Sequence, residues 1–193
     1  MQNKSMSVGK LNVFWDLDGV IFKYNAKDYF GVDPAYEKPG YFRYRDGDAR
    51  ACLIFTDMFH NENISALNIL SRGATRLSKD KQDAIVIDKT ECVKERFPWL
   101  DASHIFVTHD SKVESAEWIL KRKLCETDIL IDDYNENLIM WRNAGGTAIK
   151  YINGINSADS YSGPKIINFM IVDIPDNQTD MFEKLDTSCL RTV

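Results

Sequence analysis

The sequence predicts an α/β fold in which a parallel β-sheet carries helices on both faces. Short apolar runs alternate with amphipathic stretches along most of the chain, an order typical of repeated β-α-β units. The first run, Leu11–Trp15, is short, apolar and followed by a glycine signal, which is consistent with a buried strand of a parallel sheet. Asp16 and Asp18 follow this run directly. Open α/β sheets bind ligands at the carboxyl ends of their strands, so we expect the functional site there.

Later apolar runs predict the other strands and the helices between them. The expected strands are residues 68–70, 104–107, 128–131 and 147–151. Between the last three of these, apolar residues recur at helical spacing and predict two amphipathic helices. One helical face carries Val113, Ala116, Leu120 and Leu124, and the other carries Leu138 and Trp141 and ends near Gly145 and Gly146.

Two stretches are open to more than one interpretation. Residues 80–97 contain a strand-like segment at 84–87, but Val86, Thr90, Val93 and Phe97 fit a helix better. The tail after Asn156 contains one apolar run, residues 166–174, which we interpret as an added strand.

Residues 23–63 interrupt the alternation of strands and helices. They are rich in aromatic residues, contain Pro34, Pro39 and Gly40, and include one helical stretch at Ala49–Phe59. We interpret them as a small, mainly helical cap inserted after the first strand into an α/β core formed by residues 1–22 and 64–193. The alternative is a long irregular connection packed on the core, although structureless loops of this length are uncommon.

Composition argues against several classes of partner. The net charge of −5 over 193 residues argues against broad binding of nucleic acid. No apolar stretch approaches the roughly 20 residues that span a bilayer, and the polar start has no secretory signal, so we expect a cytoplasmic protein with no membrane partner. The four cysteines have no Cys-x-x-Cys spacing, which argues against a zinc site. Nothing in the sequence indicates an oligomeric state.

Residues suited to phosphoryl transfer follow four of the predicted strands. They are Asp16 with Asp18, Ser71, the segment 108–112, and Asp132 with Asp133. One carboxylate can act as nucleophile and another as proton donor, while a hard cation neutralises charge between the nucleophile and the phosphate. A hydroxyl and an ammonium group can hold the remaining phosphate oxygens.

Each of these features alone also has an ordinary structural explanation. Asp16 and Asp18 could lie in a turn rich in aspartate and glycine, and Asp132 and Asp133 could cap the helix that begins near Asn135. A serine at a strand end and a solvated lysine need no special function. The occurrence of all four features in this order favours the chemical interpretation.

Taken in order, the motif from Asp16 to Val20, then Ser71, Lys112 and the pair Asp132-Asp133 resemble the haloacid dehalogenase superfamily of phosphohydrolases. The resemblance covers residues 11–155. Residues 130–137 with 144–146, and the segment 40–42, are similar to the 5'(3')-deoxyribonucleotidase-like branch of that superfamily. The resemblance implies a Rossmann-like core with a cap, Mg²⁺ as cofactor and an aspartyl-phosphate intermediate.

The same resemblance implies roles for the acidic residues. Asp16 would be the nucleophile and a magnesium ligand, and Asp18 would be the general acid and then base, with its backbone carbonyl on the metal. Asp133 would be the third protein ligand, preferred over Asp132 because Asn137 lies four residues further on. Asp132 would then orient the waters of the metal.

For the phosphate, the resemblance implies contacts from Ser71 and Lys112, with Arg72 nearby. Lys112 directly follows the third strand segment and is therefore preferred over Lys89 and Lys121. Three aromatic residues of the expected cap either stack on a nucleobase or form the core of the cap itself. These residues are Tyr41, Phe42 and Tyr44.

The expected function is the magnesium-dependent hydrolysis of a small phosphomonoester, with nucleoside monophosphates as the first choice of substrate. One alternative is a phosphatase that acts on a non-nucleotide metabolite or on a nucleic-acid end. Another is a catalytically silent binding protein. The presence of both Asp16 and Asp18 argues against a silent protein, because buried carboxylates are costly and a binding module has no need for two of them.

Overall fold

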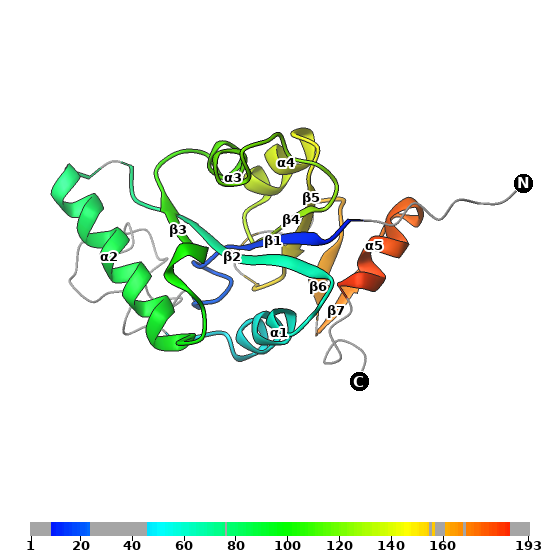
Figure 1. Cartoon of the computed structure of the whole chain (residues 1–193), viewed down its shortest axis with the longest axis horizontal. Helices are drawn as coiled ribbons and strands as arrows, with labels where there is room; N and C mark the ends of the chain where they lie inside the picture. The colour runs from blue at the N-terminus through cyan, green and yellow to red at the C-terminus, as the bar shows by residue number, and fades with distance from the viewer. Residues whose placement is uncertain are drawn as a thin grey trace, which may run out of the picture.

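Figure 1 shows the computed structural model of the chain, an α/β arrangement around one seven-stranded sheet. The structure describes residues 9–23, 46–75, 77–154, 156, 161–167 and 169–185. The strands lie in the order β3-β2-β1-β4-β5-β6-β7, and neighbouring strands are parallel except for β6 and β7. Their bounds are β1 Leu11–Trp15, β2 Ile64–Arg72, β3 Ile105–Thr108, β4 Asp128–Asp132, β5 Thr147–Tyr151, β6 Lys165–Ile167 and β7 Met170–Val172. The predicted α/β fold with a mostly parallel sheet is confirmed.

Helices cover both faces of the sheet, as predicted (Figure 1). Their bounds are α1 Ala49–Phe59, α2 Lys79–Arg96, α3 Lys112–Leu120, α4 Asn135–Asn143 and α5 Thr179–Lys184. Successive residues of β1 divide the core between the two faces. Phe14 packs with residues of α3 and α4, whereas Val13 and Trp15 pack with residues of α1, α2 and α5. This division explains why the first strand is apolar at consecutive positions.

The start of α3 is fixed by a reciprocal pair of hydrogen bonds. The Ser111 hydroxyl accepts a hydrogen bond from the backbone N–H of Glu114, and the Glu114 carboxylate accepts one from the backbone N–H of Ser111. This arrangement satisfies two donors that a helix N-terminus otherwise leaves unpaired. Because Lys112 is the first residue of α3, the cap also fixes its position at the carboxyl end of β3.

The two ambiguous stretches have clear structures. Residues 79–96 form the single helix α2, as the spacing of apolar residues favoured, and not a strand at 84–87. The expected strand at 166–174 is instead a hairpin of β6 and β7, because Phe169 has a left-handed φ of 68° and the chain reverses there.

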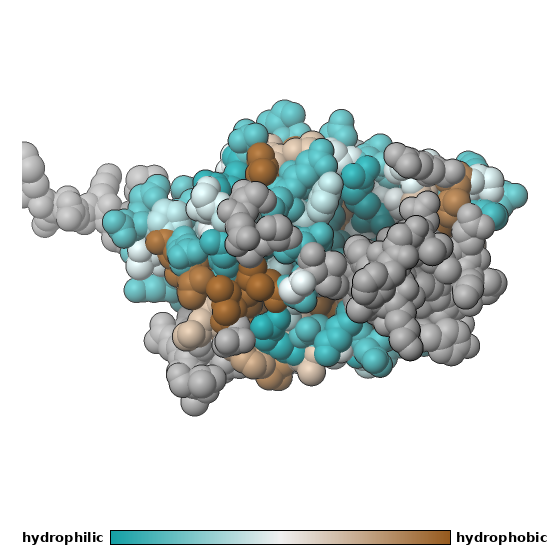
Figure 2. Space-filling model, turned by 180° about the vertical axis from the view of Figure 1, so that it is seen from behind, coloured by the Kyte–Doolittle hydropathy of each residue, from teal (hydrophilic) through white to brown (hydrophobic). Residues whose placement is uncertain are grey.

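The hairpin of β6 and β7 also leaves apolar side chains at the surface, with Ile167 and Met170 38% and 47% exposed. Figure 2 shows the face opposite to that of Figure 1, where apolar surface interrupts a mainly hydrophilic face.

Among the described helices, none is long and apolar enough to cross a membrane.

The expected cap is described only in part. Its helical stretch, α1, packs directly on the sheet, since Ile54, Phe55 and Met58 share one core cluster with Trp15. That helix therefore belongs to the core layer of the sheet and not to a separate cap. The rest of the expected cap, with Tyr41, Phe42 and Tyr44, lies outside the described residues.

The described residues on either side of residues 24–45 lie next to each other. Phe22 and Gly47 form an antiparallel bridge, and the backbone N–H of Lys23 donates to the carbonyl of Asp46 at 2.9 Å. Phe22 also bridges to Asp18, so the two ends of residues 24–45 meet beside the loop that carries this acidic residue.

Candidate active site

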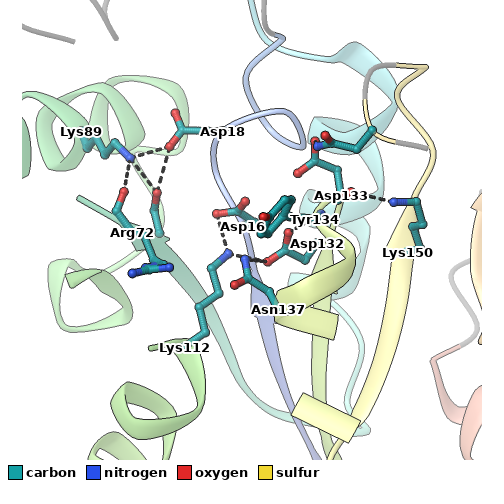
Figure 3. A network of polar contacts seen from close by, with 12 residues as sticks. Asp16, Asp18, Arg72, Lys89, Lys112, Asp132, Asp133, Tyr134, Asn137 and Lys150 are labelled. Atoms are coloured by element: carbon teal, nitrogen blue, oxygen red, sulfur yellow. Dashed lines mark hydrogen bonds and ion pairs between the residues drawn. The ribbon is translucent and has the colours of Figure 1, made fainter. Parts of the chain in front are cut away.

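Three acidic side chains meet where β1 and β4 end (Figure 3). These strands are parallel neighbours with Trp15 opposite Ile131, so Asp16 and Asp132 follow at the same level of the sheet. The backbone N–H of Asp16 donates to the carbonyl of Ile131 at 2.9 Å, which continues the pairing past the last residue of β1. One carboxylate oxygen from each of Asp16, Asp132 and Asp133 lies within 4.8 Å of the other two, and all three residues are buried.

Lys112 joins two of these carboxylates. Its ammonium group lies 2.7 Å from Oδ1 of Asp16 and 2.6 Å from Oδ2 of Asp132. The side chain of Lys112 is only 2% exposed, so solvent screens these contacts little. An ammonium group has three N–H donors, and among the described residues two are used by carboxylates. Lys112 therefore retains one donor for an anion at the end of β1.

The acidic residues carry more negative charge than Lys112 neutralises. Burial raises the pKa of Asp16 to about 8 against the opposing effect of Lys112, and the charges of Asp132, Asp18 and Asp133 raise it further. Burial alone would lower the pKa of Lys112, but the charges of Asp132 and Asp16 more than reverse this and leave it above its ordinary value. A further cation beside Asp16 would favour its ionised form at neutral pH.

Asp132 closes the turn between β4 and α4. Its Oδ1 accepts a hydrogen bond from the backbone N–H of Tyr134 at 2.8 Å, and its Oδ2 accepts one from Nδ2 of Asn137 at 2.9 Å as well as the contact from Lys112. The four-residue spacing in the sequence paired Asn137 with Asp133, but in the structure Asn137 contacts Asp132. The N-cap residue of α4 is Tyr134, whose side chain makes no cap hydrogen bond, so neither aspartate is the N-cap residue.

Asp133 is held from the loop after β5. Its Oδ2 accepts hydrogen bonds from Nδ2 of Asn153 at 2.5 Å and from Nδ2 of Asn156 at 2.7 Å. The same amide group of Asn153 donates to the carbonyl of Gly19 at 2.8 Å. Asn153 therefore connects Asp133 to the loop that follows β1, and it fixes the spacing between the two acidic segments.

The environment of Asp133 favours the neutral form of its carboxyl group more than water would. Burial raises the pKa of Asp133 to about 6, the charge of Asp132 adds to this effect, and the hydrogen bonds from Asn153 and Asn156 oppose it. The buried ammonium group of Lys150, on β5, donates to the backbone carbonyl of Asp133 at 2.7 Å. Lys150 therefore supports the backbone of the site without pairing with a carboxylate of the cluster.

A second cluster lies around Asp18, on the other side of the end of β1 (Figure 3). Oδ2 of Asp18 accepts hydrogen bonds from Nζ of Lys89 at 2.5 Å and from the Ser71 hydroxyl at 3.2 Å. Lys89 also donates to Oγ of Ser71 at 2.9 Å and to the backbone carbonyl of Arg72 at 2.7 Å. Among the described residues, Oδ1 of Asp18 is buried and has no hydrogen-bond partner.

The three carboxylates of the first cluster fit a hard divalent cation. Mg²⁺ prefers hard oxygen ligands and is usually held by carboxylates. Asp16, Asp132 and Asp133 each offer one carboxylate oxygen, and these oxygens lie within 4.8 Å of one another. Burial is the main cause of the raised pKa values of Asp16 and Asp133, but the neighbouring carboxylates also raise them, and a cation would offset this mutual repulsion. The donor set and the charge balance therefore both suit Mg²⁺.

The structure brings most of the residues singled out in the sequence to one edge of the sheet. Those with buried side chains there are Asp16, Asp18, Ser71, Lys112, Asp132 and Asp133. Arg72 takes part through its backbone carbonyl, while its side chain is exposed.

Sequence reasoning missed part of the site or ranked it low. Lys89 was weighed only as a substitute for Lys112, whereas the structure places both lysines at the site. Its signal was visible, because Lys89 continues the buried stripe of α2 that is otherwise formed by Ile85, Cys92 and Val93. Asn153, Asn156 and Lys150 had no comparable signal, since their contacts depend on the path of the chain after β5.

Comparison with known proteins identified no relative: this chain matches no protein-family model, and no curated protein sequence is significantly similar to it.

Proposed function

We propose that this chain is a magnesium-dependent phosphomonoesterase of the haloacid dehalogenase type, with Asp16 as its nucleophile. The observation that carries the proposal is the buried group of Asp16, Asp132 and Asp133 at the carboxyl ends of two parallel strands. Lys112 lies 2.7 Å from Asp16 and supplies positive charge where a phosphoryl group would arrive. The order of these residues along the chain, which resembles that superfamily, supports the same conclusion.

The first step transfers the phosphoryl group to Asp16. A carboxylate oxygen of Asp16 forms a bond to phosphorus, the ester P–O bond breaks, and its electron pair goes to the leaving oxygen. Asp18 gives a proton to that oxygen, so the product is a neutral alcohol. Mg²⁺ bound by Asp16, Asp133 and Asp132 would neutralise negative charge between the nucleophile and the phosphoryl oxygens.

The second step releases the phosphate. A water molecule attacks phosphorus and gives a proton to Asp18, which now acts as the base. The bond between phosphorus and Asp16 breaks, and the electron pair returns to the carboxylate. Lys112 holds a phosphoryl oxygen in both steps through its remaining N–H donor, while the single hydroxyl proton of Ser71 is donated to Oδ2 of Asp18.

We propose small nucleoside monophosphates as the first class of substrate to test. Support comes from the sequence, where residues 130–137 and 144–146 are similar to the deoxyribonucleotidase-like branch. Tyr41, Phe42 and Tyr44 are suitable aromatic residues for stacking on a base.

The proposal is tested by phosphate release from p-nitrophenyl phosphate and from a panel of nucleoside monophosphates and sugar phosphates. We expect turnover that requires Mg²⁺ and is lost with a chelator. Asp16→Asn should reduce kcat by at least about 10⁴-fold, because the nucleophile is removed.

Asp110→Asn is the matched control, since Asp110 is exposed and follows β3 at the same edge of the sheet. No turnover by the wild-type chain on any substrate, or full turnover by Asp16→Asn, would contradict the proposed function. Strong activity on sugar phosphates with none on nucleotides would overturn the substrate class alone.

A further inference from the structure

The position of Lys89 is unusual for a lysine. Residues 85, 89, 92 and 93 form the buried stripe of α2, and the three others are apolar. The side chain of Lys89 is 2% exposed, so its charge has left water almost completely. A buried ammonium group is tolerated when it is paired and its donors are used. Lys89 meets this condition through Asp18, Ser71 and the carbonyl of Arg72.

These contacts leave Lys89 poorly suited to bind phosphate. An ammonium group has three N–H donors, and the described residues supply three acceptors for Lys89 at 2.5–2.9 Å. Lys112, by contrast, has two such acceptors. A phosphate oxygen could reach Lys89 only by displacing a contact that stabilises its buried charge.

The contacts on Asp18 are concentrated on one of its two oxygens. Both Lys89 and Ser71 donate to Oδ2, whereas Oδ1 is buried without a partner among the described residues. Buried carboxylate oxygens usually have partners, so an oxygen without one is a candidate for a contact made only with substrate. Oδ1 is therefore the oxygen that can face a leaving group, because the two donors already point at Oδ2.

We propose that Lys89 is a positioning residue that fixes Asp18 through Oδ2, so that Oδ1 exchanges the proton with the leaving group. This inference rests on the proposed function and adds a residue from the middle of α2 to the site. Lys89 acts through Asp18 and does not touch the phosphate, and Ser71 supports the same oxygen.

The test is the dependence of kcat/KM on the leaving group, measured with Lys89→Met in the full-length chain with Mg²⁺. This ratio reports the steps up to phosphoryl transfer to Asp16, where an alkyl alcohol needs a proton from Asp18 and p-nitrophenol does not. We expect a loss of about 100-fold or more for glycerol phosphate and of less than about tenfold for p-nitrophenyl phosphate, within the range of general acid catalysis. The inhibition constant of inorganic phosphate should stay unchanged. Lys94→Met, on the exposed side of α2, should behave as wild type.

A double variant separates positioning from general damage. In Asp18→Asn, the further change Lys89→Met should not alter the leaving-group dependence, because Lys89 acts only through Asp18. Lys89→Gln, which keeps a hydrogen-bond donor, serves if Lys89→Met does not fold, and it should show the same selectivity with a smaller loss.

Equal losses for both substrates, or weaker inhibition by phosphate, would overturn the inference and make Lys89 a structural residue or a phosphate ligand. An inactive wild-type chain would instead remove the proposed function, and the inference with it.

Discussion

The two buried lysines of the site have the same chemistry but different surroundings (Figure 3). Lys112 faces a group of three carboxylates and has two acceptors among the described residues. Lys89 faces the single carboxylate of Asp18 and has three acceptors. The cluster around Lys112 therefore has an excess of negative charge, which suits a cation and then an anionic substrate. The cluster around Lys89 pairs one ammonium group with one carboxylate, which suits the fixing of one side chain.

The difference between the lysines is tested most strongly by Lys112→Met. Because Lys112 is proposed to bind the phosphoryl group, we expect kcat/KM to fall about 10²–10³-fold for p-nitrophenyl phosphate and glycerol phosphate alike. The inhibition constant of inorganic phosphate should rise. Lys121→Met is the control, as Lys121 is an exposed lysine at the end of α3. A leaving-group dependence like that expected for Lys89→Met would show that the two lysines share one role.

A smaller effect is expected from Asn153, which connects Asp133 to the loop after β1. Asn153→Ala removes hydrogen bonds to Oδ2 of Asp133 and to the carbonyl of Gly19. Since partners that orient metal ligands typically change metal affinity by about 10–100-fold, we expect the Kd for Mg²⁺ to rise within this range. Titration calorimetry measures it, with Asn143→Ala at the exposed end of α4 as the control. An unchanged Kd would show that Asp133 does not need this support or does not bind the metal.

The smallest effect concerns stability and follows from the excess negative charge around Lys112. In the metal-free chain, burial raises the pKa of Asp16 to about 8 and that of Asp133 to about 6, both above the value in an unfolded chain. Each carboxyl group then binds its proton more tightly when folded. Its contribution to stability is therefore complete below about pH 4 and is lost as the pH rises through the raised value.

Asp16→Asn should escape this loss, since an amide does not ionise. We expect the metal-free variant and the wild type to melt together near pH 4 and to separate as the pH approaches 8, with the variant more stable. The separation should be roughly 2–4 °C in Tm for each kcal/mol relieved, and thermal melts in the presence of a chelator measure it. A variant that is less stable than the wild type at pH 8 would show that the contact between Asp16 and Lys112 outweighs burial.

The sequence was sufficient to predict the features that depend on local pattern. Apolar runs located β1, β4 and β5, and helical spacing located α3 and α4. The carboxyl ends of parallel strands then brought Asp16, Ser71 and Asp132 to one edge, because topology alone determines that edge.

Features that depend on tertiary contacts were harder to predict. The reversal at Phe169 required a left-handed conformation at a residue that seldom adopts it, so the last apolar run read as one strand. The partner of Asn137 depended on which aspartate points toward α4, which spacing along the chain does not determine. Lys89 was ranked below Lys112 because a lysine in an apolar stripe can be assigned a role only once its partner is known.

The antiparallel bridge between Phe22 and Gly47 holds together the described residues on either side of residues 24–45. Main-chain contacts close this junction without using a residue of the segment itself. Doubling the length of a flexible closed loop costs only about 0.6 kcal/mol in closure entropy. This position could therefore accept a longer or shorter connecting segment, during evolution or in the laboratory, without altering the main-chain contacts that close it.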